Sequence, residues 1–145
     1  MLIAPHPGDS REQRAAEGVM LSMFSQQLGG ELAPRSIPTG SSRLELDGVS
    51  DDDHVLCDAF AHLGALKAGQ LHKVTEDLAR LLLAERILAG SWRKVLLFAD
   101  DDARESFHKG WRRDLADRFG VECIAVTLPE QMTASVRAAQ RRQFR

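Results

Sequence analysis

The stretch RLELDGVSDDDHVLCDAFA, residues 43–61, decides the fold of this chain. Its first seven residues alternate, so Leu44 and Leu46 point to one face of a strand and Asp47 to the other. A glycine and an acidic run then make a turn, and a more apolar strand follows that carries Asp58 in its middle. Two such runs joined by a short turn predict an antiparallel hairpin.

Helical and strand patterns alternate on both sides of this hairpin. The expected elements are a helix from Ser10 to about Leu28, an edge strand or a loop at Arg35–Thr39, strands at Arg43–Val49 and His54–Ala61, a helix at Lys67–Leu88, a strand at Lys94–Ala99, a helix at Ala103–Phe119, a strand at Val121–Leu128 and a helix from Glu130 to about Gln140. In the third helix Phe107, Trp111, Leu115 and Phe119 recur once per turn, which predicts that they belong to the core.

This order of elements predicts the fold class. The hairpin requires antiparallel pairing, whereas the later alternation of helix and strand requires parallel crossovers. A mixed sheet flanked by helices satisfies both, so we expect an α/β protein. Residues 1–145 are expected to form one domain, with residues 1–9 as a flexible tail.

The composition excludes several classes of protein. The net charge of −2 is not basic enough to indicate nucleic-acid binding by itself. Cys57 and Cys123 lie in apolar runs and are expected to be buried, reduced thiols, since two cysteines make neither a zinc site nor a disulfide framework. No apolar run reaches membrane-spanning length and no leader pattern opens the chain, so we expect a cytoplasmic protein without a membrane partner.

The helix, strand hairpin, helix and strand, with an aspartate on each hairpin strand, resemble the core of the PD-(D/E)xK, or restriction endonuclease-like, superfamily. In element order the resemblance covers residues 9–128, but its motif residues lie only within residues 45–73. It implies that Asp47, in Leu-Glu-Leu-Asp-Gly, and Asp58, in Leu-Cys-Asp-Ala-Phe, bind Mg²⁺ or Mn²⁺. It also implies that Glu17, on the first helix, assists as a further acid.

The sequence departs from the family at Phe60, where members carry a lysine that helps to activate water. Lys67 and Lys73, at the start of the following helix, are the available substitutes. Gln70 lies three residues before Lys73, on the same helical face, and resembles the glutamine-led helix motif of some members. The resemblance implies that Gln70 and Lys73 contact a nucleic-acid backbone.

Each of these residues also has a structural interpretation. In this interpretation Asp47 serves only to form the turn before a glycine, and Asp58 is a buried acid that is paired with Lys67 or Lys73. Glu17 is then a solvated helix residue. Arg141 and Arg142, near the end of the chain, are either solvated or contacts to phosphates.

Three functions remain open at this stage. The first is a Mg²⁺-dependent nuclease-like protein acting on DNA or RNA, with Asp47, Asp58, Glu17 and a lysine in the site. The second is a non-catalytic binding or regulatory module of the same fold, favoured by Phe60. The third is a doubly wound α/β protein that binds a small ligand near Asp100–Asp102, although no glycine-rich phosphate loop follows a predicted strand. The choice between DNA and RNA, the oligomeric state and protein partners are not determined by the sequence.

Overall fold

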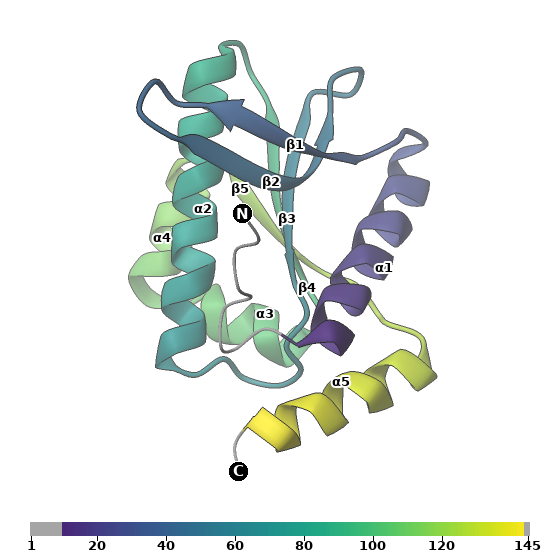
Figure 1. The fold of residues 1–145 in the computed structure, drawn as a ribbon. Coiled ribbons are helices and arrows are strands. Elements are labelled where there is room, and N and C mark those ends of the chain that lie inside the picture. Colours follow the sequence, from purple (N-terminus) through teal and green to yellow (C-terminus); the bar gives the residue numbers. More distant parts are fainter. Residues whose placement is uncertain (1–9, 144–145) are drawn as a thin grey trace.

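The computed structural model describes residues 10–143, which form five helices and a five-stranded sheet (Figure 1). The elements in chain order are α1 (Arg11–Leu28), β1 (Ala33–Pro38), β2 (Arg43–Ser50), β3 (Val55–Phe60), α2 (Ala68–Leu88), β4 (Arg93–Phe98), α3 (Asp101–Phe107), α4 (Gly110–Arg118), β5 (Val121–Ala125) and α5 (Glu130–Gln143). The tail expected at residues 1–9 lies outside the described residues.

The sheet is mixed, as the sequence predicts. Its strands lie in the order β1-β2-β3-β4-β5, antiparallel from β1 to β3 and parallel from β3 to β5. The parallel half requires crossovers, which α2 supplies between β3 and β4, and α3 with α4 between β4 and β5. The central strand β3 is buried along its whole length, although it carries the charged residue Asp58.

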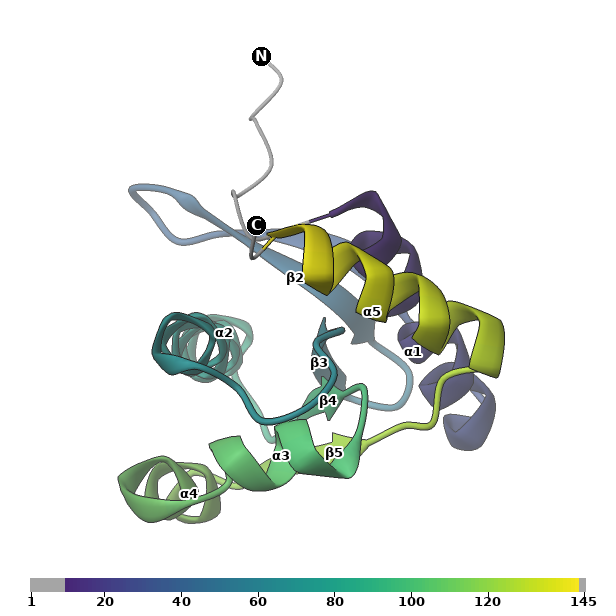
Figure 2. The same cartoon turned by 90° about the horizontal axis from the view of Figure 1, so that it is seen from below.

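Helices cover both faces of the sheet (Figure 2). One face packs against α1 and α5, through a cluster that includes Met20, Phe24, Cys57, Val95 and Val136. The other face packs against α2, α3 and α4, through a cluster that includes Leu56, Phe60, Leu78, Leu96 and Phe107. Alternate residues of β3 and β4 therefore enter different cores, and this explains why both strands read as continuous apolar runs.

The helix expected at Ala103–Phe119 is wrong in one respect, because the structure contains two helices there. Helix α3 ends at Phe107, and α4 begins at Gly110, whose φ of 60° lies in the left-handed region. This break resets the helical phase, so the spacing that links Phe107 to Trp111 no longer places both on one face. Phe107 is fully buried, whereas Trp111 and Phe119 are 59% and 55% exposed.

Other boundaries differ by a few residues. The segment around Arg35–Thr39 forms an edge strand, which settles the alternative between strand and loop. Strand β5 ends at Ala125, three residues earlier than predicted, and α5 extends to Gln143. In α5 the side-chain amide of Gln140 forms two hydrogen bonds with the main chain of Leu63, at 2.8 and 3.2 Å, and so ties α5 to the segment that follows β3.

Within residues 10–143, no helix has the length and apolar character needed to cross a lipid bilayer.

Candidate functional site

A β-bulge in β2 shapes the site. Along β1, Ala33 and Arg35 are two residues apart, but their partners on β2, Val49 and Leu46, are three apart. The extra residue falls at Asp47–Gly48. A bulge of this kind bends the strand and re-aims a side chain, and it reverses the inside–outside alternation. Leu46 and Val49 consequently both enter the core beside α2, in spite of their odd spacing.

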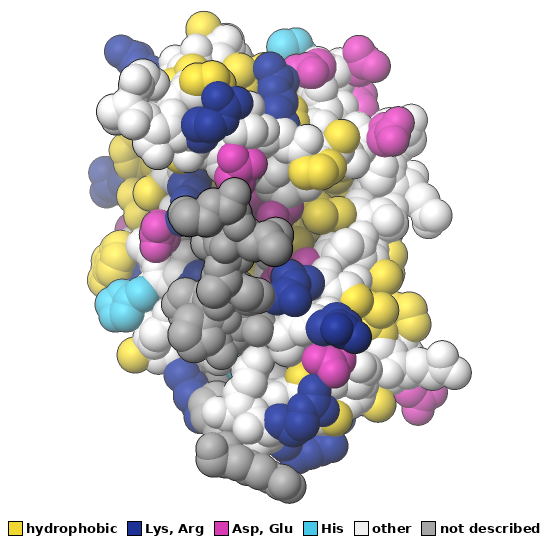
Figure 3. Space-filling model, in the orientation of Figure 1, with side chains coloured by type: hydrophobic (Ala, Val, Ile, Leu, Met, Phe, Trp, Pro, Cys, Tyr) yellow, Lys and Arg dark blue, Asp and Glu magenta, His cyan; other side chains and the backbone are white. Residues whose placement is uncertain are grey.

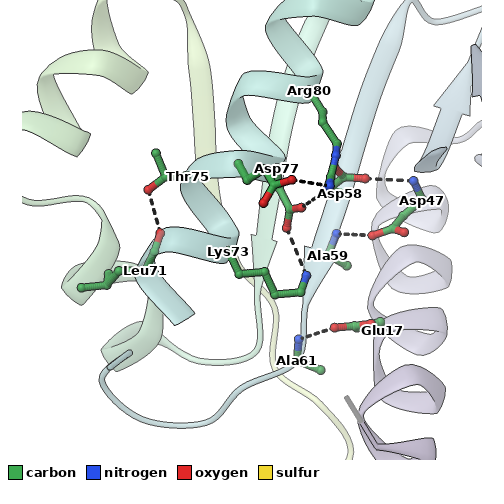
Figure 4. Close-up of polar contacts among 11 residues, drawn as sticks. Glu17, Asp47, Asp58, Ala59, Ala61, Leu71, Lys73, Thr75, Asp77 and Arg80 are labelled. Atoms are coloured by element: carbon green, nitrogen blue, oxygen red, sulfur yellow. Dashed lines mark hydrogen bonds and ion pairs between the residues drawn. The ribbon is translucent and has the colours of Figure 1, made fainter. Parts of the chain in front are cut away.

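Beyond this bulge the two hairpin strands are joined by aspartate side chains. The regular ladder between β2 and β3 pairs Gly48 with Cys57 and continues toward the turn. At the next position the main-chain N–H of Asp47 donates to Oδ1 of Asp58, at 2.9 Å. The N–H of Ala59 donates to Oδ2 of Asp47, at 3.0 Å. Each carboxylate thus accepts a hydrogen bond from the opposite strand, and the two acids hold the hairpin together where the ladder ends (Figure 4).

A cavity of about 240 Å³ opens at this point. Its lining residues come from α1, β2, β3 and α2, and they are Arg14, Glu17, Glu45, Asp47, Asp58, Ala59, Lys73, Asp77 and Arg80. Because α1 and α2 cover opposite faces of the sheet, the cavity lies where β2 and β3 diverge and side chains from both faces can meet. Acidic and basic side chains are intermixed on this side of the molecule (Figure 3).

The buried acids of the cavity resist ionisation. Asp58 is only 4% exposed. Burial, followed by the negative charges of Asp47 and Asp77, raises its pKa well above the ordinary aspartate value. Burial also raises the pKa of Asp47 and of Asp77, against the opposing effect of Lys73. Five carboxylates and three cations line the cavity, so its formal charge with every group ionised is −2. A cation would relieve the mutual repulsion of these acids.

Lys73 is the lysine that the fold brings to the aspartates. Its Nζ lies 3.4 Å from Oδ2 of Asp77 and 5.0 Å from the ring centroid of Phe60. Lys67 does not line the cavity. It precedes α2, and its main-chain N–H donates to Oε1 of Gln70, at 2.8 Å. Gln70 in turn contacts His62, at 3.1 Å, so its side chain serves the start of the helix and not the cavity.

Sequence reasoning missed Asp77 and Arg14. Asp77 is 5% exposed and lies on the apolar stripe of α2, between Val74 and Leu78. An acid on such a stripe is a detectable signal, because its burial is costly without a partner. Its partners are Lys73 and Arg80, whose Nη1 lies 3.0 Å from Oδ1 of Asp77.

The first helix contributes to the cavity from the other face of the sheet. Glu17 lines it, and one of its carboxylate oxygens accepts the main-chain N–H of Ala61, at 3.1 Å. Arg14 lies one turn earlier and makes no ion pair with any residue in the described range 10–143. The predicted phosphate contacts Arg141 and Arg142 do not line the cavity; Arg142 pairs with Glu12, at 2.8 Å.

Asp47 and Asp58 are the residues of the cavity that could hold a divalent cation. In the part of the chain that the structure describes, no group of three or more His, Cys, Asp or Glu side chains is arranged to hold a metal ion. Asp47 and Asp58 form a pair, in which each acid has one oxygen bound to the main chain. Mg²⁺ is commonly held by one or two carboxylates, with water and substrate phosphate completing its coordination. A half-buried Asp47 and a buried Asp58, whose pKa values are raised first of all by burial, are consistent with that pattern.

No protein family, no characterised protein and no solved structure matches this chain.

Proposed function

We propose that this protein is a divalent-cation-dependent phosphodiesterase of the PD-(D/E)xK nuclease-like type, acting on DNA or RNA. The observation that carries the proposal is that Asp47, Asp58 and Lys73 line one cavity, although Phe60 stands at the family's lysine position. The element order of helix, hairpin, helix and strand supports the same interpretation.

In this proposal Asp47 and Asp58 hold Mg²⁺ or Mn²⁺. The bound ion would supply Lewis-acid stabilisation of the phosphate oxygens and would favour ionisation of a water molecule. Glu17 faces the cavity from α1 and is placed to accept a proton from that water. The water attacks phosphorus, one P–O ester bond breaks, and the leaving oxygen takes up a proton. Lys73, held by Asp77, stabilises the charge that develops on the phosphate.

Arg14 is the group that we assign to binding the substrate phosphate. The other two cations of the cavity, Lys73 and Arg80, are both engaged by Asp77. Arg14 is exposed at the cavity and makes no ion pair with a described residue. A guanidinium can bind a phosphate in bidentate fashion, so Arg14 can meet an incoming phosphodiester without first breaking an ion pair.

The test combines metal binding with cleavage. Isothermal titration with Mn²⁺ is expected to show binding that is lost in Asp58→Ala and kept in Asp52→Asn, a matched control in the exposed turn of the same hairpin. Labelled DNA and RNA, incubated with Mg²⁺ or Mn²⁺, are expected to be cut by the native protein and by Asp52→Asn. Cleavage that persists in Asp58→Ala would come from a contaminant and would refute the assignment.

The second candidate is a non-catalytic module, and Phe60 is the observation that favours it. A phenylalanine cannot polarise water, and Lys73 already has Asp77 as a partner. This alternative predicts neither Mn²⁺ binding nor cleavage of any substrate. Retained Mn²⁺ binding with a complete absence of cleavage would place the protein between the two candidates, as a metal-binding member that has lost its chemistry.

A further inference from the structure

The exposed apolar surface of the protein is concentrated on two neighbouring helices. The large hydrophobic side chains that are exposed within residues 10–143 are Leu83, Ile87, Trp111 and Phe119. The two aromatic residues are the most exposed of these, and they lie at the start of α4 and directly after its end. They are eight residues apart, which on a helix corresponds to about 12 Å along the axis.

The ring of Trp111 is held in place from α2. The guanidinium of Arg112 lies 4.5 Å from the centroid of the Trp111 ring. The Nε of Arg112 also donates to Oγ1 of Thr75, at 2.8 Å, and so anchors the pair to α2. A ring that is fixed by a cation on one side and still 59% exposed is pre-organised for a further stacking contact.

Phe119, directly after α4, borders a groove of about 800 Å³ that is lined by the end of α2, residues 89–91 and Lys94 of β4. Leu82 and Arg86 of α2 line the same groove. It lies on the side of α2 away from the acidic cavity, since α4 lies beside α2 and far from α1 and α5 (Figure 2). The aspartate cavity and this groove therefore flank a single helix.

The charges around these aromatic rings favour an anionic partner. Arg86, Lys109 and Arg118 form no ion pair with any other residue between 10 and 143. Of the acids on α4 and in the groove, Asp117 is engaged by Arg113 and His108, and Glu85 by Lys94, which leaves Asp114 against three cations. The centre of a protein–protein interface is depleted in charge, whereas aromatic rings interleaved with cations are typical of surfaces that bind single-stranded nucleic acid.

We propose that α4 and the adjoining groove form a second binding surface, on which bases of single-stranded DNA or RNA stack on Trp111 and Phe119 while Arg86 and Arg118 contact phosphates. Stacking requires bases that are not already stacked in a duplex, so the surface prefers single strands. The ligand class rests on the proposed function, but this binding needs neither the metal nor the chemistry of the cavity.

The experiment uses Trp111 as its own reporter. Trp92 is only 8% exposed, so quenching of tryptophan emission by an added oligonucleotide reports on Trp111. We expect an oligothymidine of about 12 nucleotides to quench the emission in EDTA and at low salt, and added salt to weaken the binding. A duplex of the same length should bind more weakly.

Variants connect the signal to this surface. Phe119→Ala should weaken binding by about 5- to 150-fold, the range expected when one stacked base loses its partner. Trp111→Phe should keep binding in a gel-shift assay, and Trp111→Ala should lose it. Leu83→Ala, which removes an exposed apolar side chain outside the groove lining, is the matched control and should bind normally.

Three results would overturn this inference. The first is that the oligonucleotide causes neither quenching nor a gel shift. The second is that Phe119→Ala and Leu83→Ala bind the oligonucleotide with equal affinity. The third is that the tryptophan emission changes with protein concentration alone and the protein sediments as a dimer. The last result would make the surface an interface between two copies of the chain. Because the assay contains EDTA, failure of the proposed hydrolysis leaves its outcome unchanged, and binding without any cleavage would refute the enzyme while retaining this surface.

Discussion

Replacing Gly48 with alanine tests whether the bulge beside Asp47 sets the geometry of the cavity. A Cβ at position 48 would lie 3.1 Å from Cδ2 of Leu21 and 3.3 Å from Cβ of Leu32. The end of the Leu21 side chain can rotate away, but Cβ of Leu32 moves only with the main chain. Overpacking of this kind costs about 1–3 kcal/mol. Alanine also recovers about 0.5–1 kcal/mol of the entropy that glycine loses in a strand. We therefore expect a net loss of about 0–2.5 kcal/mol in the free energy of unfolding.

The matched control is Gly18→Ala, in the middle of α1, where an added Cβ meets nothing within 4 Å. That substitution should stabilise the protein by about 0.5–1 kcal/mol, because only the helix propensity changes. Urea unfolding followed by circular dichroism measures both variants. Titration with Mn²⁺ should show weaker binding for Gly48→Ala alone, since the displaced bulge re-aims Asp47. If Gly48→Ala were as stable as Gly18→Ala, or bound Mn²⁺ as the native protein does, the role assigned to the bulge would be wrong.

Three further predictions follow from burial and charge. Leu78→Ala, at a fully buried position on α2, should cost about 2–5 kcal/mol in urea unfolding, and a loss below about 1 kcal/mol would contradict its assigned place in the core. Asp58→Asn keeps the acceptor for the N–H of Asp47 but cannot ionise. Because the folded pKa of Asp58 is raised, its protonated form stabilises the native protein at low pH, and this stability is lost as the pH rises through that pKa. The Tm of the variant minus the Tm of the native protein should therefore increase from pH 4 to pH 8. A difference that stays constant over this range would refute the prediction. Burial raises the pKa of Cys57 well above its usual value and that of Cys123 to about 12, so both thiols should react with a thiol reagent at pH 8 only after denaturation, and rapid labelling of the native protein would contradict this.

The architecture could be predicted because its signals are local. Alternation in β2, the continuous apolar run of β3 and the helical stripe of α2 each depend on the chemistry of neighbouring residues. Those signals gave the mixed sheet, the antiparallel hairpin and the edge strand at β1. The predicted hairpin also indicated that Asp47 and Asp58 lie on adjacent strands, and the structure places them there.

The errors have physical causes that periodicity does not register. The break before Gly110 interrupts a pattern of aromatic residues that continues across it, so Trp111 and Phe119 read as core although they are exposed. The bulge at Asp47 leaves no mark on the alternation of the preceding residues. Asp77 was overlooked because a search for apolar periodicity passes over a charged residue within the stripe. The sequence could not decide whether Lys67 or Lys73 lines the cavity, because that depends on the direction of α2 relative to the hairpin.

The amide of Gln140 has a consequence for the order in which the chain folds. It joins residues 77 apart in the sequence, whereas the N–H of Asp47 reaches Asp58 only 11 residues away. Closing a long loop costs more entropy than closing a short one, and local contacts generally form earlier. The aspartate pair can therefore assemble with its hairpin, while the segment after β3 is fastened only when α5 docks. In native-state hydrogen exchange, the amide of Leu63 should open with α5, and the amides of Asp47 and Ala59 should open together with the sheet.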